Sequence, residues 1–576
     1  MKSLVCFVAL GMTLVINACT PRQTEDQKFE GLAKNYIEKL LETKPEWATG
    51  LGDHRYDSRI SDYSITGIDA DRSLNRAYLD SLGSLQDSML SPVNQIDYTI
   101  MTSNLQSWLF QIDTLKEYEW NPLSYNVGGA IYGLTAREFA PLKDRLLSVK
   151  ARLTLLPSIL DAARANLKNP PRVHTETAIR QNPGNIAMMR DELNTYLEKV
   201  PELKDEFAPI QQNVISALEA YGAWLEKDLL PRSTGDFRIG DEKFRRKLHF
   251  SLESDLTKED VLAKAEADLR ATQDAMYETA LPLYKKFFPK VTDPKKIEDK
   301  RLVSKAVLDK LAETRPTNET IVGMANQMVQ STTDFVRSNN LMTVPAEPVK
   351  VIVMPEFQRG VAVAYCDAPG PLEKDGETFY TISPTPADWT KQRVESFFRE
   401  YNNHMLQNLT IHEAMPGHYL QLAHSNKFKA PTMVRAIFGS GTFVEGWATY
   451  AEQLMVEKGY GGPEVKMQQL KMRLRLIINS IIDQKIHTAG MTEQEAMDLM
   501  MKKGFQEDGE AAGKWRRACL TSTQLSTYYV GNIEVNAIRA AYEAKEKGPS
   551  DMKTMHDTIL SFGSPAPRYV RAAMGL

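Results

Sequence analysis

The sequence is poor in cysteine, with only four cysteines in 576 residues. Cys6 lies in an N-terminal segment that we expect to be removed and Cys19 directly follows it, which leaves Cys366 and Cys519 in the rest of the chain. Two cysteines cannot form a disulfide framework, even in an exported protein, although a single bridge between them stays open. The sequence therefore excludes a small disulfide-rich scaffold.

Other absences narrow the class of function. No long basic run occurs, and a net charge of −4 with a pI near 6.2 gives nucleic-acid binding no support. The Gly-x-Ser-x-Gly turn that exposes a nucleophilic serine is missing, as is a glycine-rich loop that could cradle phosphates. Neither Cys366 nor Cys519 has a recognisable catalytic context. The sequence thus favours neither a serine or cysteine hydrolase nor a nucleotide-binding protein.

The N-terminus has the pattern of an export signal. A basic Lys2 precedes a mostly apolar stretch at 4–16, which is too short for a comfortable membrane span, and Ala18-Cys19 follows. This arrangement resembles a bacterial lipoprotein box, so we expect a signal peptide at 1–18 and a lipid on Cys19. Ordinary cleavage beside an incidental cysteine is the alternative. The polar residues at 19–30 would form a tether, and no other long apolar run suggests a membrane span.

Residues 412–418 read His-Glu-Ala-Met-Pro-Gly-His, a pattern typical of zinc hydrolases except for its spacing. On a straight helix, six residues turn through roughly 600°, so His412 and His418 would point about 120° apart. Pro416 cannot donate to the carbonyl of His412, and Gly417 tolerates unusual backbone angles. We therefore expect the helix to break between about 414 and 418, which would bring His418 back toward a shared metal ion.

A second helix offers the carboxylate that such a site needs. A catalytic zinc site has three protein ligands and one open position for water. Glu445 and Glu452 are seven residues apart and so lie nearly on one helix face. Neighbours such as Phe443, Trp447 and Leu454 make this helix too apolar to be solvated all round. We expect one of these two carboxylates to bind the metal and the other to support a ligand.

These segments carry a resemblance to a bacterial family of predicted zinc peptidases, often lipoproteins, whose signature is His-Glu-x-x-Pro-Gly-His. The family is distantly similar to gluzincins such as thimet oligopeptidase. The similarity extends through most of the mature chain, in segments at 45–54, 412–421, 445–452, 524–531 and 556–563. It implies that His412, His418 and Glu445 hold one Zn²⁺ ion per chain and that Glu413 is the general base.

The same resemblance suggests further site residues. The oxyanion formed during hydrolysis needs a donor besides the metal, and Tyr528 and His556 are the candidates, with a core tyrosine and a hydrogen-bonded helix histidine as the alternatives. Asp483 and His487, four apart on one helix, form a candidate second-shell pair, with a plain surface pair as the alternative. Asn479 departs from the family pattern, which often has arginine there, and this puts a substrate-binding role for that segment in doubt.

The overall pattern predicts a mostly α-helical fold with a small β-sheet. Capping boxes open helices after Thr257 and Thr492, and Pro463 suits the first turn of a helix at about 464–487. Three short β-branched or aromatic runs at 349–354, 361–366 and 378–382 predict a small sheet just before the zinc helix. We expect a helical lobe at 31–345 and a catalytic region at 346–576, without a sharp linker, around a recessed gluzincin-like cleft.

The function expected from these features is zinc-dependent hydrolysis of peptide bonds in oligopeptides. Two imidazoles, an adjacent carboxylate base and a downstream carboxylate form the full set for this chemistry. The motif does not identify the acyl group, so a zinc hydrolase of another amide or ester is an alternative, as is an inactive peptide-binding lipoprotein. A lipid on Cys19 would anchor the protein in the bacterial cell envelope. Its oligomeric state and mode of cleavage stay open.

Overall fold

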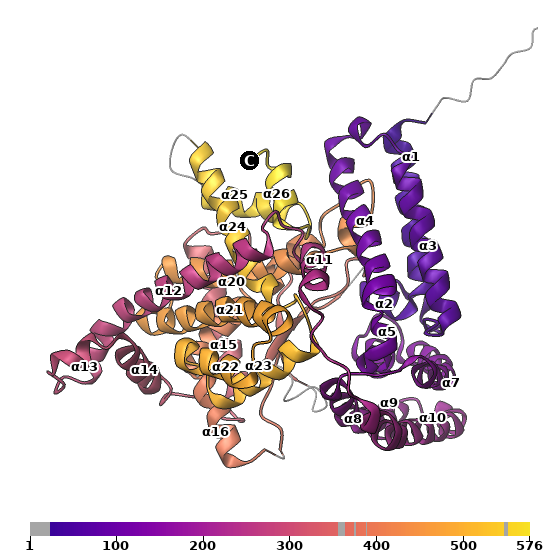
Figure 1. Ribbon diagram of the computed structural model, residues 1–576, viewed down its shortest axis with the longest axis horizontal. Coiled ribbons are helices and arrows are strands. Elements are labelled where there is room, and N and C mark those ends of the chain that lie inside the picture. The colour runs from indigo at the N-terminus through magenta and orange to yellow at the C-terminus, as the bar shows by residue number, and fades with distance from the viewer. Residues whose placement is uncertain (1–22, 355–362, 374–375, 388, 547–550) are drawn as a thin grey trace, which may run out of the picture.

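The computed structural model describes residues 23–354, 363–373, 376–387, 389–546 and 551–576. The predicted signal peptide and Cys19 lie outside these residues. Within the described chain the fold is mostly helical with one small sheet, as the sequence predicts (Figure 1). No helix among the described residues is both long enough and apolar enough to cross a membrane.

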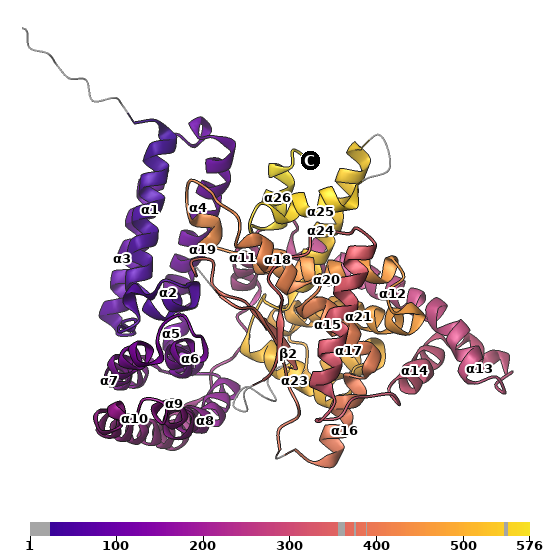
Figure 2. The same cartoon turned by 180° about the vertical axis from the view of Figure 1, so that it is seen from behind.

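The first ten helices form one side of the molecule in both views (Figures 1 and 2). Their buried faces make two hydrophobic clusters, one around Leu153 and Phe207 and one around Phe29 and Tyr36. The bounds are α1 Glu25–Thr43, α2 Pro45–Leu51, α3 Ile65–Gly83, α4 Pro92–Phe110, α5 Glu117–Trp120, α6 Gly128–Ala136, α7 Leu142–Asn166, α8 Arg172–Ala187, α9 Leu193–Leu197 and α10 Lys204–Trp224.

The predicted tether at 19–30 is too long. Helix α1 already begins at Glu25, because Thr24 and Gln27 form a reciprocal capping box that satisfies backbone donors at the helix start. Phe29 is fully buried in the core of the first helices, so the chain is anchored from this point. Polar composition suggested a tether, but a single apolar residue and a cap decide the local structure.

The remaining helices include the two that carry the His-Glu motif at 412–418 and the helices around them. They are α11 Asp241–Leu252, α12 Lys258–Phe287, α13 Pro294–Glu298, α14 Lys300–Leu311, α15 Ile321–Ser338, α16 Lys391–Glu400, α17 Asn403–Glu413, α18 His418–Ser425, α19 Val434–Ile437, α20 Gly441–Glu457, α21 Gly462–Ala489, α22 Glu493–Asp498, α23 Asp508–Leu520, α24 Ser526–Lys545, α25 Met552–Leu560 and α26 Pro567–Ala573. The capping boxes at Thr257 and Thr492 are confirmed, and Pro463 lies in the first turn of α21.

The predicted strand cluster forms a three-stranded sheet, with β1 Lys350–Val353, β2 Ala364–Asp367 and β3 Phe379–Ile382 in the order β1-β3-β2. Strand β3 is parallel to β1 and antiparallel to β2. Part of the predicted second strand, including Val361, lies outside the described residues. Strand β2 is at the edge, so its outer side has no partner strand in this sheet, and the Cys366 amide on β2 donates to Glu413 of α17 instead.

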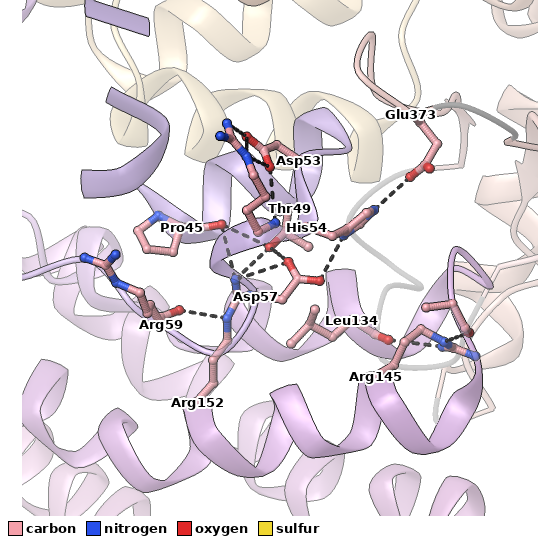
Figure 3. A network of polar contacts seen from close by, with 12 residues as sticks. Pro45, Thr49, Asp53, His54, Asp57, Arg59, Leu134, Arg145, Arg152 and Glu373 are labelled. Atoms are coloured by element: carbon pink, nitrogen blue, oxygen red, sulfur yellow. Dashed lines mark hydrogen bonds and ion pairs between the residues drawn. The ribbon is translucent and has the colours of Figure 1, made fainter. Parts of the chain in front are cut away.

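The first helices also contact the segment that follows β2. The imidazole of His54 bridges Asp57 at 2.9 Å and Glu373 at 3.0 Å (Figure 3). Burial lowers the pKa of His54, but the two carboxylates outweigh it and raise the pKa above its usual value. Nearby, the Leu372 amide donates to the Leu51 carbonyl at 2.8 Å. This segment of the catalytic region is therefore held against the N-terminal helices.

Candidate metal centre

The helix that begins at Asn403 ends at Glu413, and a new helix begins at His418. Between them, Ala414 has φ −119° and ψ −86°, and the Gly417 amide donates to the Ile411 carbonyl at 2.9 Å. A Cβ on Gly417 would lie 1.9 Å from the His412 carbonyl oxygen, so only glycine fits this close approach. The predicted break between 414 and 418 is confirmed.

The break brings His412 and His418 together. Their ring centroids are 4.6 Å apart and the planes are nearly perpendicular. The Oε2 atom of Glu445 lies 3.5 Å from His412 Nε2 and 3.6 Å from His418 Nε2. One ligand atom from each residue lies within 4.8 Å of the other two, which suits a shared metal ion. Buried Glu445 Oε2 has no hydrogen-bond partner in the described structure, as expected of an atom that binds a cation.

Glu452 orients the first histidine. Its Oε1 lies 2.7 Å from His412 Nδ1 and its Oε2 accepts a hydrogen bond from Asn408 at 2.7 Å. Since a carboxylate can only accept here, Nδ1 carries a proton, so in the neutral ring that binds a metal the lone pair is on Nε2, on the side of Glu445 and His418. Asn408 was not singled out from the sequence, although it lies one turn before His412 on the same helix face.

The two imidazoles respond differently to the buried site. Burial lowers the pKa of His418 to about 4, with a further contribution from His412, so this ring is neutral near pH 7. Burial also lowers the pKa of His412, but Glu445 and Glu452 outweigh it and raise the pKa well above the usual value. Neutral imidazole is the form that binds a metal, and a cation in the cluster would disfavour protonation of both rings.

Glu413 lies beside the cluster and against the edge strand. Its Oε2 accepts a hydrogen bond from the Cys366 amide of β2 at 3.1 Å. Burial raises the pKa of Glu413 to about 7, a change that His412 opposes and Glu445 reinforces. A carboxyl group that titrates near neutral pH is suited to accept and return a proton. The sheet thus positions the predicted base.

The helix that carries Glu445 is held against α24 by two glycines. A Cβ on Gly446 would lie 2.5 Å from the Gly531 backbone, so the helices touch through their main chains. This contact places Tyr528 beside Glu445. Burial raises the pKa of Glu445, but the nearby His412, His418 and Tyr528 outweigh it and bring the pKa below its usual value. Tyr528, one of the two predicted oxyanion donors, therefore lies next to the cluster of the three proposed metal ligands.

His556 has a different environment. Its Nδ1 donates to the Leu341 carbonyl at 2.7 Å, and the Tyr450 hydroxyl donates to its Nε2 at 2.8 Å. The ring is fully buried, and burial lowers its pKa to about 4. Both nitrogens are thus engaged in holding α25 to the core. These contacts favour a structural role and give no support to His556 as an oxyanion donor.

Asp483 supports a helix rather than a metal ligand. It accepts hydrogen bonds from the Thr523 amide at 2.9 Å and from the Ser526 amide at 3.0 Å. It therefore anchors the start of α24, the helix that carries Tyr528. His487 is directed elsewhere, toward the carbonyls of Ala518 and Thr521. The predicted second-shell role of Asp483 would be exerted through the backbone of α24.

A cavity of about 1670 Å³ opens beside the cluster. Its lining includes His412, Glu413 and Tyr528, together with Thr177 and Arg180 of α8. The cavity therefore lies between the N-terminal helices and the catalytic region. Val363 and Ala364, at the start of the edge strand, line it as well. Asn479, the departure from the family pattern, is also in the wall.

Residues 45–574 match a family described as "Bacterial protein of unknown function (DUF885)". The chain belongs to this family. A solved structure of a "putative lipoprotein of unknown function" from Shewanella oneidensis is similar, with 34% identity, 95% of this chain and 100% of that chain covered, and a TM-score of 0.80. The family match at residues 45–574 spans His412, His418 and Glu445.

Two further solved structures are more distant in sequence. A "putative lipoprotein" from Colwellia psychrerythraea has 16% identity and a TM-score of 0.77 over 96% of this chain and 99% of its own, which shows a common fold. An M32 carboxypeptidase from Deinococcus radiodurans R1 has 12% identity and a TM-score of 0.42 over 96% of both chains, a likeness too weak to support a function. No curated protein matches the chain.

Proposed function

We propose that the protein is a zinc-dependent hydrolase of peptide bonds. The observation that carries this proposal is the convergence of one ligand atom each from His412, His418 and Glu445 within 4.8 Å, with Glu413 adjacent. Two imidazoles and one carboxylate are a common ligand set of catalytic zinc. Zinc bound by such a set lowers the pKa of a water molecule toward about 7 and polarises a carbonyl oxygen.

The chain's own residues would handle the protons. Glu413, held by the Cys366 amide, takes a proton from the attacking water and passes it to the leaving amine. Burial raises its pKa when no metal is bound, and a bound cation would oppose this change and favour the carboxylate that accepts the proton. Tyr528 is placed to donate its hydroxyl proton in a hydrogen bond to the oxygen of the substrate carbonyl as negative charge develops there. Glu452 keeps His412 oriented throughout.

The cavity suits an extended peptide. Its walls come from two regions, which we infer to be two helical lobes around a recessed cleft, and folded proteins would not enter such a site. The edge strand β2 begins in the wall, so its backbone can hydrogen-bond a peptide backbone. We therefore propose oligopeptides as substrates. With a lipid on Cys19, the enzyme would meet them outside the cytoplasm, anchored in the cell envelope.

Other functions are compatible with the same residues. A zinc hydrolase acting on a different amide or an ester would use the same ligands and base, because these groups do not identify the acyl group. A peptide-binding lipoprotein without activity would use the cavity alone. The intact Glu413 argues against this last reading, because a binding protein has no use for a buried carboxyl group beside the ligands.

Digestion of a mixed peptide library separates these readings. The mature chain, loaded with zinc, is incubated with the library and the products are read by mass spectrometry. We expect peptide fragments from the wild type and none from Glu413→Gln, with Glu457→Gln, at the exposed end of the same helix as Glu445, as the active control. Absence of cleavage by the zinc-loaded wild type would overturn the proposal, and equal cleavage by Glu413→Gln would remove Glu413 as the base.

A further inference from the structure

Cations gather on one part of the cavity wall. Helix α23 directs Lys514, Arg516 and Arg517 into the lining, and Arg180 of α8 lines the cavity as well. In the sequence the three residues of α23 look like ordinary charges on an exposed helix. The structure instead places all three in the wall of the cavity that His412 and Glu413 also line.

These cations have few anionic partners. Arg180, Arg516 and Arg517 form no ion pair with a carboxylate of the described residues. Arg517 donates instead to Gln524 Oε1 at 2.8 Å and to the Tyr528 hydroxyl at 3.2 Å. Lys514, with a side chain only 11% exposed, has Glu510 at 4.0 Å. The wall also contains carboxylates, but Arg180, Arg516 and Arg517 are not paired with one in the described part of the chain.

Glu510 also interacts with other residues, so its negative charge compensates the charge of Lys514 only in part. It lies 3.5 Å from Arg475 and accepts a hydrogen bond from the Tyr401 hydroxyl at 3.1 Å. Burial lowers the pKa of Lys514 to about 8, a change that Glu510 opposes and Arg517 reinforces. Burial likewise lowers the pKa of Arg180, with a further contribution from Arg516. A bound anion would relieve the repulsion between these neighbouring cations.

The position of the cations relative to the metal centre limits what the anion can be. Arg517 donates to the Tyr528 hydroxyl, and Tyr528 in turn interacts with Glu445. The guanidinium is thus separated from a proposed ligand by a single side chain. Because an extended residue spans at most about 3.5 Å, an anion held here is within one or two residues of the bond to be cleaved.

We propose that Lys514 and Arg517 bind the C-terminal carboxylate of a peptide substrate, so that the enzyme removes one or two residues from the C-terminus. This inference rests on the proposed peptidase activity. Arginine and lysine recognise carboxylates through charge-assisted hydrogen bonds, and guanidinium can do so through two donors at once. An acidic side chain near the C-terminus has the same chemistry and is the source that the experiment must distinguish.

The wild-type enzyme alone provides the first test. A pentapeptide with a free C-terminus, its C-terminal amide, and an amide with glutamate as the last residue are compared at equal concentration. We expect the free acid to be cleaved roughly 10- to 100-fold faster in kcat/KM than either amide, since a hydrogen bond to a charged group contributes on this scale. Equal cleavage of acid and amide would overturn the carboxylate subsite and leave the peptidase intact. Recovery with the glutamyl amide would assign the subsite to side chains.

Variants then assign the effect to the two residues. In Lys514→Met and Arg517→Met the preference for acid over amide should shrink about tenfold or more, whereas Lys514→Arg should retain most of it. Lys503→Met, which removes an exposed lysine outside the cavity, is the matched control. A preference that is unchanged in both methionine variants would overturn the assignment.

Binding without turnover separates this inference from the proposed function. Calorimetry of zinc-loaded Glu413→Gln with the same acid and amide should show tighter binding of the acid, and this difference should be lost in Glu413→Gln/Lys514→Met. If no peptide is cleaved by the wild type but the acid still binds preferentially, the peptidase proposal fails and the subsite stands. Equal affinity for acid and amide would contradict the subsite whatever the activity.

Discussion

Glu452 accepts hydrogen bonds from both His412 and Asn408 within 2.7 Å, although it makes no contact with the other two proposed ligands among the described residues. It is 1% exposed, so its negative charge is buried directly behind the imidazole. A carboxylate in this position raises the basicity of a histidine ligand and fixes its ring orientation. Metal affinity should therefore depend on a residue that does not itself bind the metal.

Glu452→Ala tests this dependence. We expect zinc affinity to fall roughly 10- to 100-fold, the usual effect of losing a partner behind a histidine ligand. Competition with a chromophoric chelator measures the affinity directly. Glu457→Ala is the control, since Glu457 ends the same helix in an exposed pair with Arg539. Unchanged zinc affinity in Glu452→Ala would mean that His412 is held by the backbone alone.

Gly417→Ala tests the helix break. An added Cβ would lie 1.9 Å from the His412 carbonyl, so the backbone must shift and move His418 relative to His412. We expect zinc retention to fall and kcat/KM to drop roughly 100-fold, because displacement of a catalytic group by about 1 Å has effects of this order. Gly441→Ala serves as control, since a Cβ at Gly441 meets nothing within 4 Å. Normal zinc content in Gly417→Ala would show that the break tolerates rearrangement.

Gly531→Ala tests the contact between α20 and α24. Its Cβ would lie 2.0 Å from the Thr442 carbonyl oxygen, so the helices must separate. Overpacking of this kind costs about 1–3 kcal/mol, and the melting temperature should fall. Gly323→Ala, on α15 with nothing within 4 Å, should have the opposite sign because alanine favours a helix by about 1 kcal/mol. Equal melting temperatures of the two variants would contradict the close contact.

We expect the stability of the fold to depend on pH through Glu534 of α24, a residue outside the candidate metal centre. Burial raises its pKa from 4.5 to about 7; Ser254 opposes this change and Asp255 reinforces it. Its Oε2 atom has no hydrogen-bond partner among the described residues. Because the folded state holds the proton more tightly than the unfolded state, this stabilisation is fully present below about pH 4.5. It is lost as the pH rises toward 7 and beyond.

Glu534→Gln should remove this dependence. The variant should be similar to the wild type in stability near pH 5 and more stable at pH 8, by on the order of 2 kcal/mol, since each pKa unit is worth about 1.4 kcal/mol. Melting temperatures of both proteins across this range provide the measurement. A difference between the two proteins that stays constant with pH would mean that Glu534 is hydrated in the folded state.

The sequence predicted the features that depend on residues close together in the chain. The helix break follows from Pro416 and Gly417, the capping boxes from residues three apart, and the strand cluster from short apolar runs. A carboxylate ligand from the helix with Glu445 and Glu452 was expected from the apolar character of that helix and from the ligand count of zinc, and the family resemblance singled out Glu445. Residues near one another in the sequence were enough to predict these features, because other local backbone structures would be sterically or energetically unfavourable for them.

Other features depend on contacts that sequence spacing does not encode. His556 donates to the carbonyl of Leu341, which is 215 residues away in the sequence. Asp483 accepts hydrogen bonds from two backbone amides that are about 40 residues away from it. The charges of Lys514 and Arg517 have the same pattern as those of a solvated helix. Only the packing of α23 against the cavity shows that they face the metal centre.

The zinc content of the purified chain tests the central claim most directly. Native mass spectrometry of the mature protein, after zinc loading and removal of excess metal, should show about one zinc ion per chain, the stoichiometry of a three-ligand catalytic site. Glu445→Gln should show far less under the same conditions, whereas Glu413→Gln should retain the ion. A wild-type chain that binds no zinc, or a Glu445→Gln chain that binds as much as the wild type, would contradict the account.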